Sequence, residues 1–276
     1  MRIAAAFACV GVAALAGAAT VKLDPSAAAL AQAMDGHRVV LLGEVHDNAS
    51  QHALRIAALR QLVATGARPA IAFEQFDRER QHDIDAARRA RPGDPDYLIA
   101  QARGDPGWRW AFYRPYVELA LENDLPIVAA NLSRRDAIRV AVDGWSAVFD
   151  AATVRKLGLD ALPVDYRRKH EAAIAAGHCN TLPEEALPAR ARAQMARDLV
   201  LARSLGPYVG RGVVLLGGNG HVRRDIGVAF WLPAETARQA IAIGLLESGD
   251  DGADFDAYVV TAPAERDDPC KALRPN

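Results

Sequence analysis

At 276 residues, 51% of them hydrophobic, the chain is long enough to bury one large core or two small ones. Its 33 basic and 34 acidic residues leave a formal net charge of −1, which gives no electrostatic attraction for the phosphates of a nucleic acid. Nucleic-acid binding is therefore not an expected function.

The N-terminal segment has the pattern of a secretory signal. A basic residue is followed by an apolar run over residues 3–15 and then by small residues, and this run is short for a membrane span. We expect residues 1–19 to be a signal peptide, cleaved near Ala18 or Ala19, and residues 20–276 to form the mature domain. An alanine-rich N-terminal helix is the alternative.

Beyond the leader, short apolar strands alternate with longer amphipathic helices. The predicted strands are residues 39–42, 69–73, 126–130, 213–216, 238–246 and 255–261, and the predicted helices are residues 50–65, 77–91, 108–123, a segment after 131, 164–176 and 189–205. The charged helix 77–91 is expected to be solvated, and Pro115 to kink the 108–123 helix or end its first segment. The alternation predicts an α/β fold, a single domain with a mainly parallel central sheet flanked by helices.

Four of the predicted strands end in polar residues. The first and fourth strands share the letters VVLL, at 39–42 and 213–216, and each is followed by a glycine and then by a histidine, His46 or His221. The two strands between them in the chain are followed by Glu74 and by Asn131. Chance agreement across four strands is less expected than a shared site.

The carboxyl ends of parallel strands form the edge at which open α/β sheets bind ligands. We therefore expect Glu44, His46, Glu74 and His221 to meet in one cavity at that edge. Two carboxylates and two imidazoles suit a divalent metal ion of the zinc or manganese kind, or a catalytic general acid/base pair around a carbonyl substrate. The alternative is that each polar residue only caps the next helix, a role that suits Asn131.

Five segments together resemble a known family. They are GEVHDN (43–48), AFEQF (72–76), YRPYVELA (113–120), LPIVAANLSR (125–134) and GGNGHVRRDIGV (217–228). Over residues 38–230 the chain resembles the ChaN family of haem-binding uptake proteins, which is similar in turn to the Tiki and erythromycin-esterase-like hydrolases. The resemblance implies a bacterial envelope protein linked to iron acquisition, with haem-uptake or outer-membrane machinery as a partner. It also implies that the Glu/His pocket is hydrolytic, either active or kept as a scaffold.

Haem binding needs an axial ligand, apolar walls and bases for the propionates. The resemblance implies a tyrosine ligand and haems stacked between two protomers, so that haem induces a homodimer. Tyr166 and His170 are four residues apart on one helical face, with Arg167 and the two bases after it available for propionates. An ordinary exposed basic helix is the alternative. Tyr113 and Tyr116 are rival ligands, although Tyr113 is expected to line the pocket.

The cysteines bear on the compartment. Cys9 lies too early in the leader to be a lipoprotein cysteine, so a lipid anchor is not expected. Once the leader is removed, Cys179 and Cys270 are the two that remain. An oxidising compartment would allow them to pair, and two free thiols are the alternative.

The sequence therefore favours an exported haem-binding protein of the periplasm or cell envelope that takes part in haem and iron uptake. A metal-dependent hydrolase of the peptidase or esterase type, using the Glu/His pocket, is the second hypothesis. A catalytically silent binding module that uses the same pocket is the third.

Overall fold

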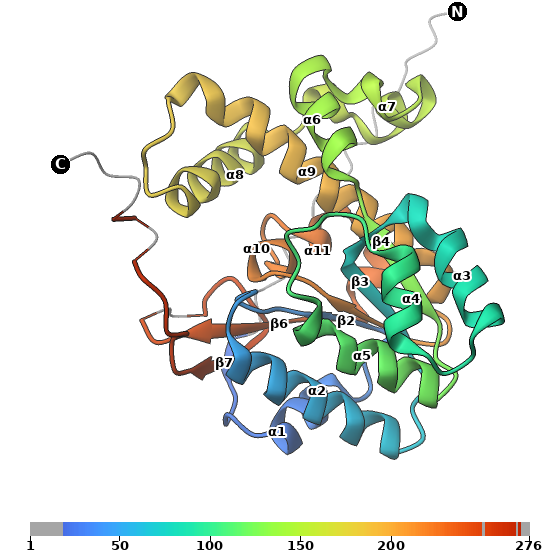
Figure 1. The fold of residues 1–276 in the computed structure, drawn as a ribbon. Coiled ribbons are helices and arrows are strands. Elements are labelled where there is room, and N and C mark those ends of the chain that lie inside the picture. Colours follow the sequence, from blue (N-terminus) through green and yellow to red (C-terminus); the bar gives the residue numbers. More distant parts are fainter. Residues whose placement is uncertain (1–18, 250–251, 269, 272–276) are drawn as a thin grey trace, which may run out of the picture.

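The computed structural model describes residues 19–249, 252–268 and 270–271, so residues 1–18 of the predicted leader (1–19) lie outside the described residues. Within the described chain, seven parallel strands form one sheet in the order β1-β7-β6-β2-β5-β3-β4 (Figure 1). They are β1 (Val21–Lys22), β2 (Val39–Leu42), β3 (Ala70–Asp77), β4 (Ile127–Asn131), β5 (Val213–Leu216), β6 (Ala240–Glu247) and β7 (Ala257–Thr261). The predicted α/β fold with a parallel sheet is confirmed.

The two VVLL strands are neighbours at the centre of the sheet. β2 pairs with β5 in register, from Val39 opposite Val213 to Leu42 opposite Leu216. All eight side chains are buried because helices cover both faces. Alternate residues of β2 enter different cores: Val40 and Leu42 pack on one face and Val39 and Leu41 on the other.

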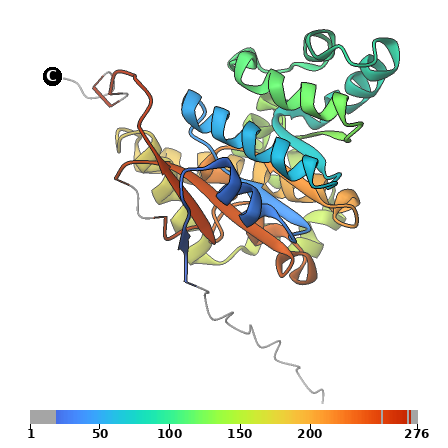
Figure 2. The same cartoon turned by 90° about the horizontal axis from the view of Figure 1, so that it is seen from below.

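One face of the sheet is covered by the helices of the first half of the chain. They are α1 (Ala27–Met34), α2 (Ala49–Ala64), α3 (Gln81–Ala90), α4 (Pro95–Ala102) and α5 (Trp110–Glu122). Figure 2 shows α1 and α2 crossing in front of the strands. The side chains of Ser26, Asn48 and Asp94 accept N–H groups at the first turns of α1, α2 and α4, which explains where these helices begin.

The second face and a helical cap are built from the second half of the chain. The C-terminal half of α9 (Leu187–Leu205), with α10 (Asn219–Val222), α11 (Val228–Trp231) and α12 (Ala234–Ala237), lies on the second face. The cap consists of α6 (Arg134–Asp143), α7 (Ala151–Leu157), α8 (Val164–Gly177) and the N-terminal half of α9 (Figure 1). Trp145, Phe149, Tyr166 and Met195 form a separate core inside this cap.

Two local predictions need correction. Ile84 and Ala87 of α3 are buried, so the charged stretch is amphipathic and packs on the sheet instead of being wholly solvated. Of the two effects expected of Pro115, the end of a first segment does not occur, because α5 is a single helix through it. Pro115 lies near the start of the helix, where its missing N–H costs one backbone hydrogen bond. No helix in the described part is long and apolar enough to cross a membrane.

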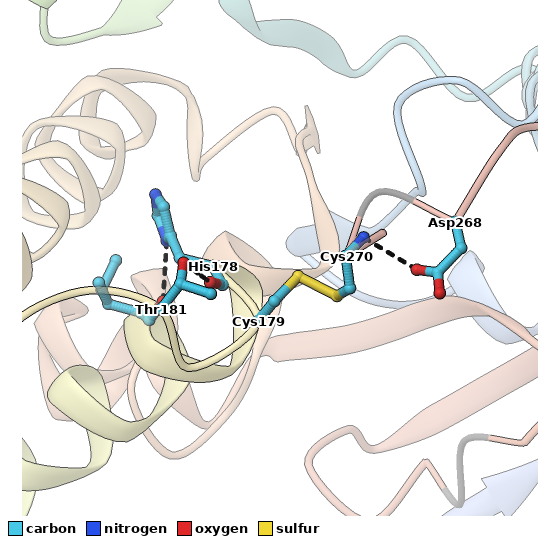
Figure 3. The surroundings of a disulfide bond; sticks show 6 residues. His178, Cys179, Thr181, Asp268 and Cys270 are labelled. Carbon is cyan, nitrogen blue, oxygen red and sulfur yellow. Dashed lines mark hydrogen bonds between the residues drawn. A yellow bond between two sulfur atoms is a disulfide. The ribbon is translucent and has the colours of Figure 1, made fainter. Parts of the chain in front are cut away.

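The predicted disulfide is present. Cys179 and Cys270 are joined, with their Cα atoms 5.5 Å apart and a sequence separation of 91 (Figure 3). The bond ties the segment that follows β7 to the turn between α8 and α9. Cys270 is thereby fixed to the helical cap.

Candidate functional site

A cavity of about 800 Å³ opens at the carboxyl edge of the sheet. It lies beyond the ends of β2, β5, β3 and β4, which are neighbours in the strand order. Glu44, His46, Glu74 and His221, the four residues predicted to meet, all line it. The full lining is Glu44, Val45, His46, Glu74, Asp77, Asp105, Trp108, Asn131, Arg134, Gly177, Gln194, Arg197, Gly218, Asn219, Gly220, His221 and Arg266.

Glu44 is the centre of a buried hydrogen-bond network. Its side chain is fully buried and forms an ion pair with Arg55 of α2, which is also fully buried. The hydroxyl of Tyr113 donates to Oε1 of Glu44 at 2.5 Å, and Nδ1 of His46 lies 2.8 Å from the same oxygen. His52, 3.6 Å from Oε2, has its pKa lowered to about 4 by burial and is neutral at pH 7. The charge of Glu44 is therefore balanced by Arg55.

His46 is held with one ring edge toward the cavity. A carboxylate only accepts hydrogen bonds, so Nδ1 of His46 carries a proton and donates it in a hydrogen bond to Glu44. When the ring is neutral, Nε2 therefore keeps its lone pair. The side chain is 46% exposed and packs edge-on against Trp108 at 4.9 Å. A Cβ at Gly218 would lie 2.8 Å from Nε2, so this close approach requires glycine.

Glu74, His221 and Asp198 form a second buried network. Nε2 of His221 lies 3.3 Å from Glu74, and Nδ1 lies 2.5 Å from Asp198 of α9. The backbone N–H of Gly218 donates to the other oxygen of Glu74 at 2.7 Å. A shift of register between β3 and β4, between Phe73 and the end of β3, accompanies the placement of Glu74.

The three groups of this network shift one another's pKa values. Burial by itself would lower the pKa of His221, but the charges of Glu74 and Asp198 outweigh burial and raise it to about 10. Burial raises the pKa of Asp198 to about 6 in spite of His221. Burial also opposes ionisation of Glu74, but His221 brings its pKa below the usual range. At pH 7 an imidazolium thus lies between two carboxylates.

The structure does not support the predicted divalent metal. Among the described residues, no three His, Cys, Asp or Glu side chains are grouped so that they could hold an ion. Both ring nitrogens of His221 face carboxylates, and Glu44 is paired with Arg55. Of the four side chains that the sequence offered to a metal, three are engaged inside the protein, and His46 keeps one ring nitrogen toward the cavity.

Three of the residues predicted to bind haem, Tyr166, His170 and Arg167, do not line this cavity. Tyr166 and His170 do share one face of α8, but that face is buried, and both side chains donate to the carbonyl of Ile226, at 3.1 and 2.8 Å. Phe230 stacks on the Tyr166 ring at 3.7 Å. Arg167 donates to the Leu162 carbonyl and lines a different pocket. The structure therefore brings Tyr166 and His170 together in the core of the cap.

Burial also affects the two candidate phenols. Burial raises the pKa of Tyr166 and that of Tyr113 above the ordinary value, which disfavours the phenolate form. Tyr113 contacts the base of the cavity through Glu44. In this structure neither hydroxyl is free, because both are hydrogen-bonded inside the protein.

A shallow groove of about 220 Å³ adjoins the cavity, and we call it the α6–α8–α9 groove. Its lining is Arg134, Ala137, Ile138, Ala141, Ile174, His178, Arg190, Ala193, Gln194 and Arg197. Arg134, Gln194 and Arg197 also line the cavity, so the two are continuous. No local sequence pattern indicates this groove, because its residues come from three helices that meet only in the folded protein.

Two buried charges were also missed. Arg55 follows the spacing of Leu59 and Leu62 on α2, and Asp198 follows that of Ala202 and Leu205 on α9. Each is a charged residue within an apolar helical stripe. A charged residue in an apolar helical stripe is buried with that stripe and needs a buried partner. This position in the sequence could therefore have indicated both charges.

The fold and the cavity define an open parallel α/β protein with its site at the carboxyl edge of the sheet. The family described as haem-binding uptake, Tiki superfamily, ChaN matches residues 30–232. The chain belongs to this family, which confirms the resemblance seen in the sequence. No curated protein matches the chain.

Solved structures resemble the fold. The structure described as cofacial heme binding to ChaN of Campylobacter jejuni has a TM-score of 0.66 at 20% identity, covering 82% of this chain and 88% of that one. The type III effector HopBA1 has a TM-score of 0.47 at 12% identity, covering 87% and 94%. The erythromycin esterase EreC has a TM-score of 0.44 at 13% identity, covering 80% and 76%.

Proposed function

We propose that this protein binds haem as cargo in haem and iron uptake at the cell envelope. The observation that carries the proposal is its membership of the haem-binding uptake family over residues 30–232. The described residues fit such a cargo, because the cavity and the α6–α8–α9 groove combine apolar side chains, arginines and two partly exposed imidazoles, His46 and His178. These are the parts that haem recognition needs.

Export to the periplasm or envelope is part of the proposal. It is supported by the signal-like sequence of residues 1–19 and by the Cys179–Cys270 disulfide, since such bonds persist in oxidising compartments. Contact with outer-membrane or haem-uptake machinery is proposed on the same grounds. Lipid anchoring is not proposed, because Cys9 is poorly placed for it.

A tyrosine ligand and a haem-induced dimer are the finer expectations from the family. The Campylobacter jejuni protein is described as binding haem cofacially, which supports a stacked pair between two protomers. Tyr166 stays the candidate tyrosine from the sequence. For its phenol to reach iron, the hydroxyl must leave the Ile226 carbonyl and Phe230 must move.

A hydrolase that uses the Glu/His pocket is not favoured. A general base must accept a proton from water or substrate. His221 is held as an imidazolium between Glu74 and Asp198, and Glu44 is paired with Arg55. Most of the set is thus engaged in internal ion pairs.

Titration of hemin into the mature protein tests the proposal. We expect a saturable Soret change with about one haem per chain, and sedimentation velocity should show a larger species only when hemin is present. Bovine serum albumin and a hemin-only blank calibrate non-specific adsorption. Non-saturating absorbance changes in this protein would contradict haem binding, and saturation without a change in sedimentation would contradict the dimer.

A further inference from the structure

The α6–α8–α9 groove presents apolar side chains to solvent. Its floor is made by Ala137, Ile138 and Ala141 of α6, Ile174 of α8 and Ala193 of α9. Ile138 is 54% exposed, and Val142, one turn further along α6, is 75% exposed. Neighbouring exposed apolar side chains of this size are a feature of binding surfaces.

His178, at the end of α8, offers a free ring nitrogen in this groove. Its Nδ1 lies 2.8 Å from the carbonyl oxygen of Ile174. Because a carbonyl only accepts, Nδ1 carries the proton, and Nε2 of the neutral ring keeps its lone pair. Among the described residues, no hydrogen-bond donor engages Nε2. Histidines that bind a metal commonly donate one ring N–H to a backbone carbonyl, which orients the ring and leaves the other nitrogen free for the metal.

The backbone around His178 is firmly held. Its neighbour Cys179 is bound to Cys270, and Cys179 and Asn180 have φ values of 58° and 56°. Two successive residues in the left-handed region form a tight turn that the disulfide and the end of α8 keep in place. Figure 3 shows the His178 ring directed away from the disulfide. The imidazole is therefore preorganised on the groove side.

The rim of the groove is basic. Its lining contains three arginines and neither Asp nor Glu, whereas the adjoining cavity is lined by four carboxylates. Arg197 is held by the Asn131 side chain and the Leu132 carbonyl. Arg134 and Arg190 make no ion pair with any described residue, so two guanidinium groups are available to a ligand that carries two carboxylates.

We propose that haem lies on the α6–α8–α9 groove, with Nε2 of His178 on the iron and the two propionates paired with Arg134 and Arg190. This inference rests on the proposed function and deepens it, because it assigns the ligand to an imidazole in place of a tyrosine. Tyr166 is engaged with Ile226 in the interior, whereas His178 meets the groove without rearrangement. An apolar floor, an open nitrogen donor and two unpaired cations match the three parts of haem.

Hemin titrations of His178 variants test the ligand. His178→Ala should weaken hemin affinity by about tenfold or more and remove the iron–imidazole stretching band from the resonance Raman spectrum of the ferrous form. His178→Gly should regain that band when free imidazole is added, which a merely structural role would not produce. His82→Ala is the matched control, because His82 is a 76% exposed histidine of α3, and it should behave as wild type.

The rim is tested separately. Arg134→Gln with Arg190→Gln should weaken hemin binding by about tenfold, the loss expected for charge-assisted hydrogen bonds, and leave the iron–imidazole band unchanged. The inference is overturned if wild type saturates with hemin while His178→Ala keeps the wild-type spectrum, or if Tyr166→Phe is the variant that changes it. In either case the proposed function survives. Failure of wild type to saturate overturns the proposed function itself.

Discussion

Arg55 and Glu44 are both fully buried and form an ion pair. The hydrogen bonds of Glu44 with Tyr113 and His46 at the cavity depend on this pair. A buried charge is tolerated only when its partners are in place, since removing one partner leaves the other unpaired. Arg55 also donates to the Leu42 carbonyl at the end of β2, at 2.9 Å. This arginine therefore fixes both the charge of Glu44 and the strand end from which Glu44 projects.

His221 makes the stability of the protein depend on pH. The pKa of this imidazole is raised from 6.5 to about 10 in the folded state, so its stabilising contribution is complete below pH 6.5 and is lost as the pH rises through about 10. We expect the difference in unfolding free energy between wild type and His221→Gln to shrink on the order of 3 kcal/mol between pH 7 and 10.

Urea unfolding at several pH values measures this difference. The charged groups that face the His221 imidazole are Glu74 and Asp198, and Arg197 and His46 lie near these two carboxylates. His82→Gln serves as the control, since its side chain is 76% exposed, and should follow the wild-type pH profile. Parallel pH profiles for wild type and His221→Gln would show that the folded protein does not hold an imidazolium there.

At the scale of elements, the sequence predicted what is locally encoded. β2 and β5 were predictable because a continuous apolar run that ends at a glycine is typical of a strand covered on both faces. The shared cavity was predictable because the polar residues after four parallel strands lie at the same edge of the sheet. The core of the helical cap was not predictable, because Tyr166 looks like a surface residue of a basic helix until α11 packs on it. The groove likewise depends on how α6, α8 and α9 pack.

Gly218, the residue directly before α10, leaves room for the His46 ring because it has no side chain. A Cβ at Gly218 would lie 2.8 Å from both Cε1 and Nε2 of that ring, so Gly218→Ala should displace the imidazole and destabilise the protein by about 1–3 kcal/mol, as overpacking does. Thermal unfolding and the NMR signals of the His46 ring measure the two effects. Gly220→Ala, two residues further and within α10, is the control, because nothing lies within 4 Å of its Cβ position. Equal behaviour of the two variants would contradict the close approach.

At the scale of the whole molecule, the disulfide links the segment after β7, which contributes to the cavity, to the turn at His178, which contributes to the α6–α8–α9 groove. Arg266, in the segment after β7, lines the cavity and forms ion pairs with Asp47 and Glu247. Further along the chain, Cys270 is bound to Cys179 beside His178. One residue of this segment thus lines the cavity, and another fixes the turn that holds the proposed haem ligand.

Removing the disulfide should therefore affect stability and haem binding together. The double variant Cys179→Ser, Cys270→Ser should lose about 2–4 kcal/mol of unfolding free energy, because the unfolded chain is no longer constrained. It should also bind hemin more weakly, because the turn that orients His178 is released. Wild type treated with a thiol reductant should match the double variant in urea unfolding and in hemin titration, and the double variant should be insensitive to the reductant. Unchanged hemin affinity after reduction, with stability lowered, would show that the disulfide supports the fold without positioning His178.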